Sequence, residues 1–338
     1  MNPTHLILID IWFFLLGLIL ALYVVLDGFD LGVGILSLFS EHERRRLMMA
    51  SLSTVWDANE TWLVIFGGAL FGAFPLAYGL ILNALYVPVL LMLVGLIFRA
   101  VSFELHSHAR RQRVWDLAFG LGSLLAAISQ GLILGGLLNG IRVDAAGAFA
   151  GSLADWLDPF TLATVAGVVA GYAMVGSAYL IMRTEGEVQR HFFGLGLVVT
   201  VCTFGAAIAT MILMPSLHAP LAKRWTSEPF AGYLLTVFSG SAAAFLLLIR
   251  SLAKRQKHAP FLWSIAIFLL TFCGVWAGIY PYIVPATVTA QAAASSSETL
   301  VIMLASIGML IPVIIFYNGY VYLVFRGDIT EESGYGEP

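Results

Sequence analysis

Six ionisable side chains stand inside long apolar stretches of this sequence. They are Asp27 and Asp30, Asp57 and Glu60, and Arg99 and Glu104. The two members of each acidic pair are three residues apart, which places them on the same face of a helix. A charged side chain at the middle of a bilayer costs about 2.5–3.5 kcal/mol on insertion scales, so each one requires a partner or a function. Desolvation and mutual repulsion favour the neutral form of such carboxyls, so the chemistry that they indicate is proton binding and release.

Three interpretations of these residues remain open at the level of sequence. Arg99 can neutralise one or two carboxylates in an ion cluster that is only structural. The carboxyls can instead form a hydrated path through which protons enter from the cytoplasm. A site for a coupling ion or a substrate is the third interpretation. Gly28 and Gly32 would allow another helix to approach the Asp27 and Asp30 face closely, whereas Gly68 and Gly72, at the same spacing, indicate simple packing.

The remaining chemically interesting side chains are more easily explained by structure. Trp56 could stack on a quinone headgroup or a lipid, although interfacial anchoring explains such a tryptophan more often, and Trp12 also suits an interfacial anchor. The seven histidines all fall at predicted helix ends or in loops, so we expect no axial haem ligand and no other metal site in this chain. His106 and His108 are predicted to lie in a solvated loop. Cys202 and Cys273 lie far apart in apolar segments and are predicted to be small core residues.

The composition defines the elements that must position these groups. Of 338 residues, 60% are hydrophobic and only 11% are charged, and the mean hydropathy is +0.91. These values exclude a water-soluble globule and predict an all-α polytopic membrane protein, a single transmembrane domain over residues 1–338. The net charge is only −3 and the basic residues form short separate clusters, which excludes nucleic acid as a partner.

Nine transmembrane helices are predicted from the apolar stretches. They lie near residues 6–39, 48–80, 83–105, 114–139, 159–182, 191–214, 229–250, 260–283 and 298–325. Two four-helix bundles with one peripheral helix would accommodate them. The prolines near residues 281–285 are expected to stop the eighth helix.

The distribution of lysine and arginine predicts the orientation. Thirteen of the seventeen fall on one set of alternate connections: Arg44, Arg45, Arg46, Arg110, Arg111, Arg113, Arg183, Arg190, Arg250, Lys254, Arg255, Lys257 and Arg326. The other side carries Arg142, Lys223 and Arg224, and Arg99 lies inside a helix. By the positive-inside rule the N-terminus lies outside and the C-terminus in the cytoplasm. All six ionisable residues then lie in the cytoplasmic half of their helices.

Several motifs together resemble one family. They are Asp27-Gly28-Phe29-Asp30-Leu31-Gly32-Val33-Gly34, Trp56-Asp57 with Asn59-Glu60-Thr61-Trp62, Phe98-Arg99 with Phe103-Glu104, and Tyr280-Pro281-Tyr282-Ile283-Val284-Pro285. These motifs and the final helix resemble subunit II of the cytochrome bd-type quinol oxidases. The short outer loops resemble those of the cyanide-insensitive branch of that family.

The resemblance implies a terminal oxidase of the bacterial cytoplasmic (inner) membrane that oxidises quinol and reduces oxygen to water. It implies that haem b and haem d are carried by a partner, subunit I, against which this chain packs. Small single-helix subunits, membrane lipids and a bound structural quinone are compatible with the same resemblance.

The resemblance also implies a proton path that enters from the cytoplasm. Asp57 carries over most directly, followed by Asp27 with Asp30, then Glu104, with Arg99 as the counter-charge. Glu60 matches the family least well. Trp56 is the candidate contact for a quinone or a lipid.

A rival from another class is a proton-coupled secondary transporter. Its substrate would sit near the midplane at a matched pair of broken helices. The ionisable residues lie nearer the cytoplasmic end, and the two halves of the sequence show no such pair.

Overall fold

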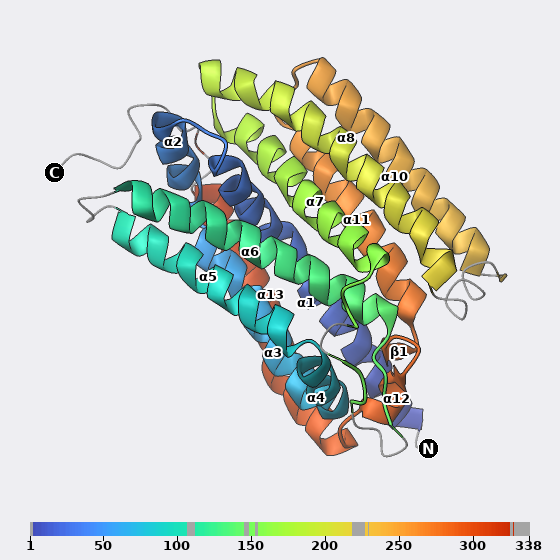
Figure 1. Ribbon diagram of the computed structural model, residues 1–338. Helices are drawn as coiled ribbons and strands as arrows, with labels where there is room; N and C mark the ends of the chain where they lie inside the picture. Colours follow the sequence, from blue (N-terminus) through green and yellow to red (C-terminus); the bar gives the residue numbers. More distant parts are fainter. Residues whose placement is uncertain are drawn as a thin grey trace.

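The computed structural model describes residues 3–106, 112–144, 149–152, 155–217, 227–228, 230–324 and 327, and these form an elongated bundle of helices (Figure 1). The helices are α1 (Pro3–Ser37), α2 (His42–Leu52), α3 (Trp56–Ala73), α4 (Pro75–Ala84), α5 (Tyr86–His106), α6 (Gln112–Asn139), α7 (Pro159–Arg183), α8 (Gly186–Leu217), α10 (Phe230–Ala253), α11 (Ala259–Ile279), α12 (Ala290–Ala293) and α13 (Ser297–Val324). Strands β1 (Tyr282–Val284) and β2 (Val288–Thr289) pair antiparallel. Within these residues, eight helices are long and apolar enough to span a membrane, and a bent pair supplies a ninth candidate.

The spans form two groups of four with one helix outside them. In the first group α1 packs against α3 and α6, and α5 packs against α6; in the second, α7 packs against α8 and α11, and α10 against α11. Contacts of α7 with α1 and α6 join the groups, while α13 lies against α3 and α1 (Figure 1). The all-α membrane fold expected from composition is therefore confirmed.

The second predicted helix, 48–80, is wrong as a single element. Residues 42–52 form the separate helix α2, and α3 and α4 meet at an angle of 120°. Phe74 at the bend has extended φ of −135°, because Pro75 disfavours the helical conformation in the preceding residue and has no N–H to donate. Ser295 donates its backbone N–H to Ala73 O at 2.9 Å and its hydroxyl to Gly72 O at 2.7 Å. Carbonyls left open at the end of α3 are thereby satisfied.

The expected close approach to α1 is made by α7. An added Cβ at Gly32 would lie 1.8 Å from the backbone oxygen of Tyr172, and at Gly28 it would lie 2.7 Å from the Tyr172 ring. Only glycine allows the two backbones to come so near. Gly68 by contrast has no atom within 4 Å of an added Cβ.

Helix α11 ends earlier than the eighth predicted helix. Residues 260–283 were expected to be helical, but α11 ends at Ile279 and the chain enters β1 through Tyr280 and Pro281. The Tyr280 hydroxyl donates to Asp10 Oδ1 at 3.1 Å. Burial and this hydrogen bond raise the pKa of Tyr280. The N-terminal end of α1, β1 and α12 lie together at one end of the bundle, and α2 lies at the other (Figure 1).

Three side chains lie elsewhere than expected. Trp12 is not an interfacial anchor: it is fully buried and donates Nε1–H to Leu300 O at 3.0 Å. Cys202 and Cys273 are exposed at the surface of this chain instead of packed in its core. In a membrane protein apolar side chains face lipid as readily as the interior, so hydrophobicity does not separate the two locations.

Candidate functional site

Helices α1, α3 and α5 bring four of the six ionisable residues together. Asp27, Asp30 and Arg99 are completely buried, and the side chain of Glu60 is 24% exposed. We call these four residues the acidic cluster. At a rise of about 1.5 Å per residue, the cluster lies roughly 10–15 Å from the Ser37 end of α1.

Arg99 bridges two carboxyls of the acidic cluster. Its Nη1 lies 2.5 Å from Asp27 Oδ1, and its Nη2 donates to Glu60 Oε2 at 3.0 Å. The planar guanidinium suits this arrangement, because its several N–H groups point at two acceptors at once. Arg99 therefore links the fully buried end of the acidic cluster to its partly exposed end.

Asp30 is held from α3 and α13 by residues that sequence reasoning did not assign. Asn59 donates Nδ2–H to Asp30 Oδ2 at 2.9 Å, and the Tyr322 hydroxyl donates to Asn59 Oδ1 at 2.8 Å. Asn59 stands beside Glu60 in the motif Asn59-Glu60-Thr61-Trp62, and this position was the sequence signal that could have identified it. Tyr322 is 263 residues further along the chain, and no local pattern connects the two.

A second polar group reaches the acidic cluster from α6 and α7. Gln130 donates Nε2–H to Tyr23 Oη at 2.7 Å, and the Tyr172 hydroxyl donates to Gln130 Oε1 at 2.5 Å. Tyr23 lies one helical turn before Asp27 on α1. None of these three residues was singled out from the sequence.

The charges of the acidic cluster do not balance. Three carboxyl groups face one guanidinium in a region almost without solvent. Unpaired buried charge is costly, and carboxyls in that situation bind protons instead. The arrangement is therefore able to hold and exchange protons.

Asp57, Glu104 and Trp56 lie outside the acidic cluster. Asp57 is exposed in the first turn of α3, where its negative charge interacts favourably with the helix dipole. Glu104 is exposed near the end of α5. Trp56 is half-buried, and its ring stacks on Phe103 with centroids 5.2 Å apart.

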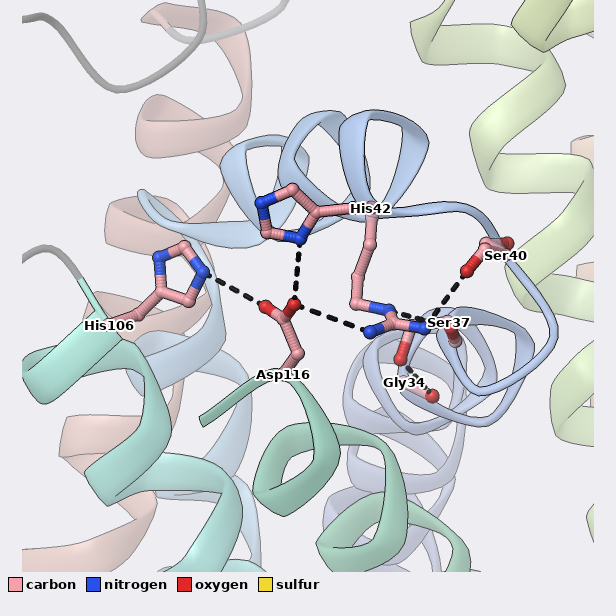
Figure 2. A network of polar contacts seen from close by, with 7 residues as sticks. Gly34, Ser37, Ser40, His42, His106 and Asp116 are labelled. Carbon is pink, nitrogen blue, oxygen red and sulfur yellow. Dashed lines mark hydrogen bonds and ion pairs between the residues drawn. The ribbon is translucent and has the colours of Figure 1, made fainter. Parts of the chain in front are cut away.

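Figure 2 shows a separate network at the α2 end of the bundle, centred on Asp116 of α6. Asp116 Oδ1 lies 2.9 Å from His106 Nε2, while Oδ2 lies 3.1 Å from His42 Nδ1 and accepts from Arg45 Nη1 at 3.3 Å. His106 is buried, so its predicted place in a solvated loop is wrong; the carboxylate of Asp116 compensates its burial. His108, the other residue of that prediction, lies outside the described residues.

Arg45 also ties this network to the end of α1. It donates to Ser37 O and Ser40 O, each at 2.9 Å. Free carbonyls at a helix end are satisfied in this way, and α1, α2, α5 and α6 are held together (Figure 2).

The histidines of the described residues do not fit an axial haem ligand inside the bundle. His5, His42, His191 and His258 stand near helix starts, and the one buried ring, His106, bonds Asp116. No group of three or more His, Cys, Asp or Glu residues in the described part of the chain could hold a metal ion. That this chain ligates no haem iron stays a prediction.

Comparisons with known proteins agree along nearly the whole chain. The family described as cytochrome bd terminal oxidase subunit II matches residues 8–325. Cytochrome bd-I ubiquinol oxidase subunit 2 of Escherichia coli (strain K12) is 30% identical, with 96% of this chain and 95% of the relative covered. Cytochrome bd ubiquinol oxidase subunit 2 of Bacillus subtilis (strain 168) is 25% identical, with 96% and 97% covered. The fold resembles that in the structure of the bd oxidase from Geobacillus thermodenitrificans, with a TM-score of 0.80 at 18% identity over 94% of this chain and 98% of that one.

Proposed function

The chain belongs to the cytochrome bd terminal oxidase subunit II family, and from this premise we propose that it serves an oxidase that oxidises quinol and reduces oxygen to water. Its partner is subunit I, which carries haem b and haem d. The position of the described histidines at helix ends supports this division of labour. Small single-helix subunits and membrane lipids complete the proposed complex, and Trp56 is the proposed contact for a quinone or lipid.

The chain's own contribution is a path for proton uptake from the cytoplasm. The single observation that carries this proposal is the buried acidic cluster, in which one guanidinium faces three carboxyls. Glu60 is the member that solvent reaches, and Arg99 connects it to Asp27. Asp57 and Glu104 are exposed and collect protons at the surface, and Asp30 and Asp27 form the inner part of the path.

The oxygen chemistry explains why such a path is needed. Reduction of one oxygen molecule to water consumes four electrons and four protons. A dry bundle passes protons only through titratable groups and ordered water. A secondary transporter is not favoured, because the bent pair found among the described helices, α3 and α4, breaks at Phe74, far along α3 from Glu60.

Replacing Asp57 by asparagine, or Glu60 by glutamine, tests the proton path. Each change keeps the size of the side chain and removes the carboxyl that carries the proton. We expect oxygen consumption by the purified complex to fall by about one to two orders of magnitude, with normal haem spectra.

Glu187→Gln is the matched control, because Glu187 is an exposed acidic residue on α8 that forms an ion pair with Arg190, also exposed. It should leave turnover unchanged. Wild-type rates across the pH range in both Asp57→Asn and Glu60→Gln would reject the path and leave a structural ion cluster.

The proposed orientation places the N-terminus outside and the C-terminus in the cytoplasm. It predicts that alkaline phosphatase fused after Ser152 is active, because that loop joins α6 and α7 at the outer end. A fluorescent protein fused after His258, between α10 and α11, should be bright. The reverse pair of results would overturn the orientation.

A further inference from the structure

Three polar side chains next to Asp27 form a hydrogen-bonded chain in which every donor points the same way. It runs from Tyr172 on α7 through Gln130 on α6 to Tyr23 on α1. Tyr172 gives its hydroxyl proton to the amide oxygen of Gln130, and Gln130 gives an N–H to the oxygen of Tyr23. The oxygen of Tyr23 is therefore occupied as an acceptor, and its own proton remains to be donated.

Asp27 is the acceptor that the last donor of this chain can reach. It lies four residues after Tyr23, so both side chains project from the same face of α1. Asp27 Oδ2 is buried and has no hydrogen-bond partner among the described residues. An ionised carboxylate is an acceptor only, so the single proton of Tyr23 is directed to it. Because the Tyr23 proton goes to Asp27, the Tyr23 oxygen accepts from Gln130, and the N–H end of the Gln130 amide faces Tyr23.

Gln130 prevents the chain from acting as a proton path. Proton relay requires each member to accept a proton on one side and release one on the other, as water, hydroxyl and carboxyl groups do. The Gln130 amide accepts from Tyr172 with its carbonyl oxygen and donates an N–H to Tyr23. Neither group changes its role by taking up or releasing a proton. The chain therefore polarises Asp27 without leading protons away from it.

We propose that Tyr23, Gln130 and Tyr172 are positioning residues that hold Asp27 as the permanent counter-charge of Arg99. Glu60, the other carboxyl paired with Arg99, is then the one that exchanges protons. The inference rests on the proposed proton-uptake function and revises one part of it: Asp27 borders the inner part of the path and stays ionised instead of exchanging protons itself. Hydrogen bonds to the ionised form of a carboxyl favour that form, and hydrogen bonds in series strengthen one another. In the described part of the chain Glu60 is held by Arg99 without such a chain, and its side chain is partly exposed.

The other polar and titratable groups around Asp27 and the neighbouring Asp30 come from the helices packed on this part of α1. They are Asp30 on α1, Asn59 and Glu60 on α3, Arg99 on α5, Gln130 on α6, Tyr172 and Tyr179 on α7 and Tyr322 on α13. Phe268 of α11 stacks on Tyr172 and adds no charge. Among the described residues, Arg99 is the cation that pairs with the carboxyls of the acidic cluster. Loss of the Tyr23 hydroxyl is therefore not compensated by a second cation there.

The test uses the assembled oxidase with Tyr23→Phe, Gln130→Leu and Tyr172→Phe. Removing the Tyr23 hydroxyl deprives the carboxylate of Asp27 of a hydrogen bond, so we expect the acid limb of the pH–rate profile to move upward by about one pH unit. Gln130→Leu and Tyr172→Phe should move it in the same direction by successively smaller amounts. Tyr280→Phe is the matched control, because it removes a tyrosine donor to Asp10, another carboxyl of α1 far from the acidic cluster.

Infrared spectroscopy of the same complexes gives a readout that does not depend on turnover. Tyr23→Phe should gain a carboxylic acid band that is absent from the double variant Tyr23→Phe/Asp27→Asn. The inference is overturned when the three variants show neither a shift nor a new band beyond those of Tyr280→Phe. Should Tyr23→Phe fail to assemble, Tyr172→Phe, at the far end of the chain, decides by the same criteria.

The two proposals fail differently. A new band together with wild-type turnover in Asp57→Asn and Glu60→Gln rejects proton uptake but retains the positioning of Asp27. Slow turnover in those two variants with no band and no shift retains proton uptake and rejects the positioning chain.

Discussion

Arg99→Gln is expected to prevent normal accumulation of the subunit. The change leaves three carboxyls facing each other in a region almost without solvent, with no cation between them. Breaking a buried ion pair by removing one partner costs about 3–5 kcal/mol, a large share of the stability of a protein domain. The measurements are the amount of assembled complex in membranes and the Tm of the detergent-solubilised complex.

Two comparisons make this result specific. Arg190→Gln removes an arginine from an exposed pair with Glu187, which is worth less than about 1 kcal/mol, and should accumulate normally. Arg99→Lys should be intermediate, because a single ammonium cannot contact Asp27 and Glu60 with the geometry of a guanidinium. Normal levels and an unchanged Tm in Arg99→Gln would mean that the charges of the acidic cluster do not depend on this residue.

Gly32→Ala is expected to be almost as damaging, although it adds only one methyl group. The new Cβ would lie 1.8 Å from the backbone oxygen of Tyr172, and backbone cannot rotate away as a side chain does. Helices α1 and α7 must separate, which disturbs the junction between the two groups of spans. Overpacking of this kind costs about 1–3 kcal/mol and more where backbone must shift.

Gly68→Ala is the control for the glycine prediction. Gly68 also lies inside an apolar helix, α3, but nothing lies within 4 Å of an added Cβ. Alanine is the better helix former, so this variant should be as stable as the wild type or slightly more so. Equal Tm values for Gly32→Ala and Gly68→Ala would contradict the packing that we describe.

The positions of the helices were predictable because spanning a bilayer requires a long apolar run. Predicted segments such as 159–182 and 298–325 differ by one residue at each limit at most from α7 and α13. The break at Phe74 was missed, although Pro75 was the local signal for it. A helix that bends back within an apolar stretch has the same composition as one that continues straight.

The acidic cluster was predictable only in part. Buried charge is rare enough that Asp27, Asp30, Glu60 and Arg99 stand out in an apolar sequence, and a spacing of three residues places the acidic pairs on shared helix faces. Whether Asp57 or Glu60 reaches Arg99 depends on the rotation of α3, which the sequence does not contain. The structure pairs Glu60 with Arg99 and leaves Asp57 exposed.

The sequence by itself determined the membrane class, the family and the residues that carry charge, because these follow from composition and from motifs along one chain. Only the tertiary structure decided that Tyr322, Gln130 and Tyr172 complete the acidic cluster, that His106 is buried against Asp116, and that Trp12 lies inside while Cys202 lies outside. The physical reason is that hydropathy measures transfer to an apolar medium, and lipid and protein interior are both such media. Which polar side chains become partners depends on how distant helices pack, and a local sequence pattern does not contain that information.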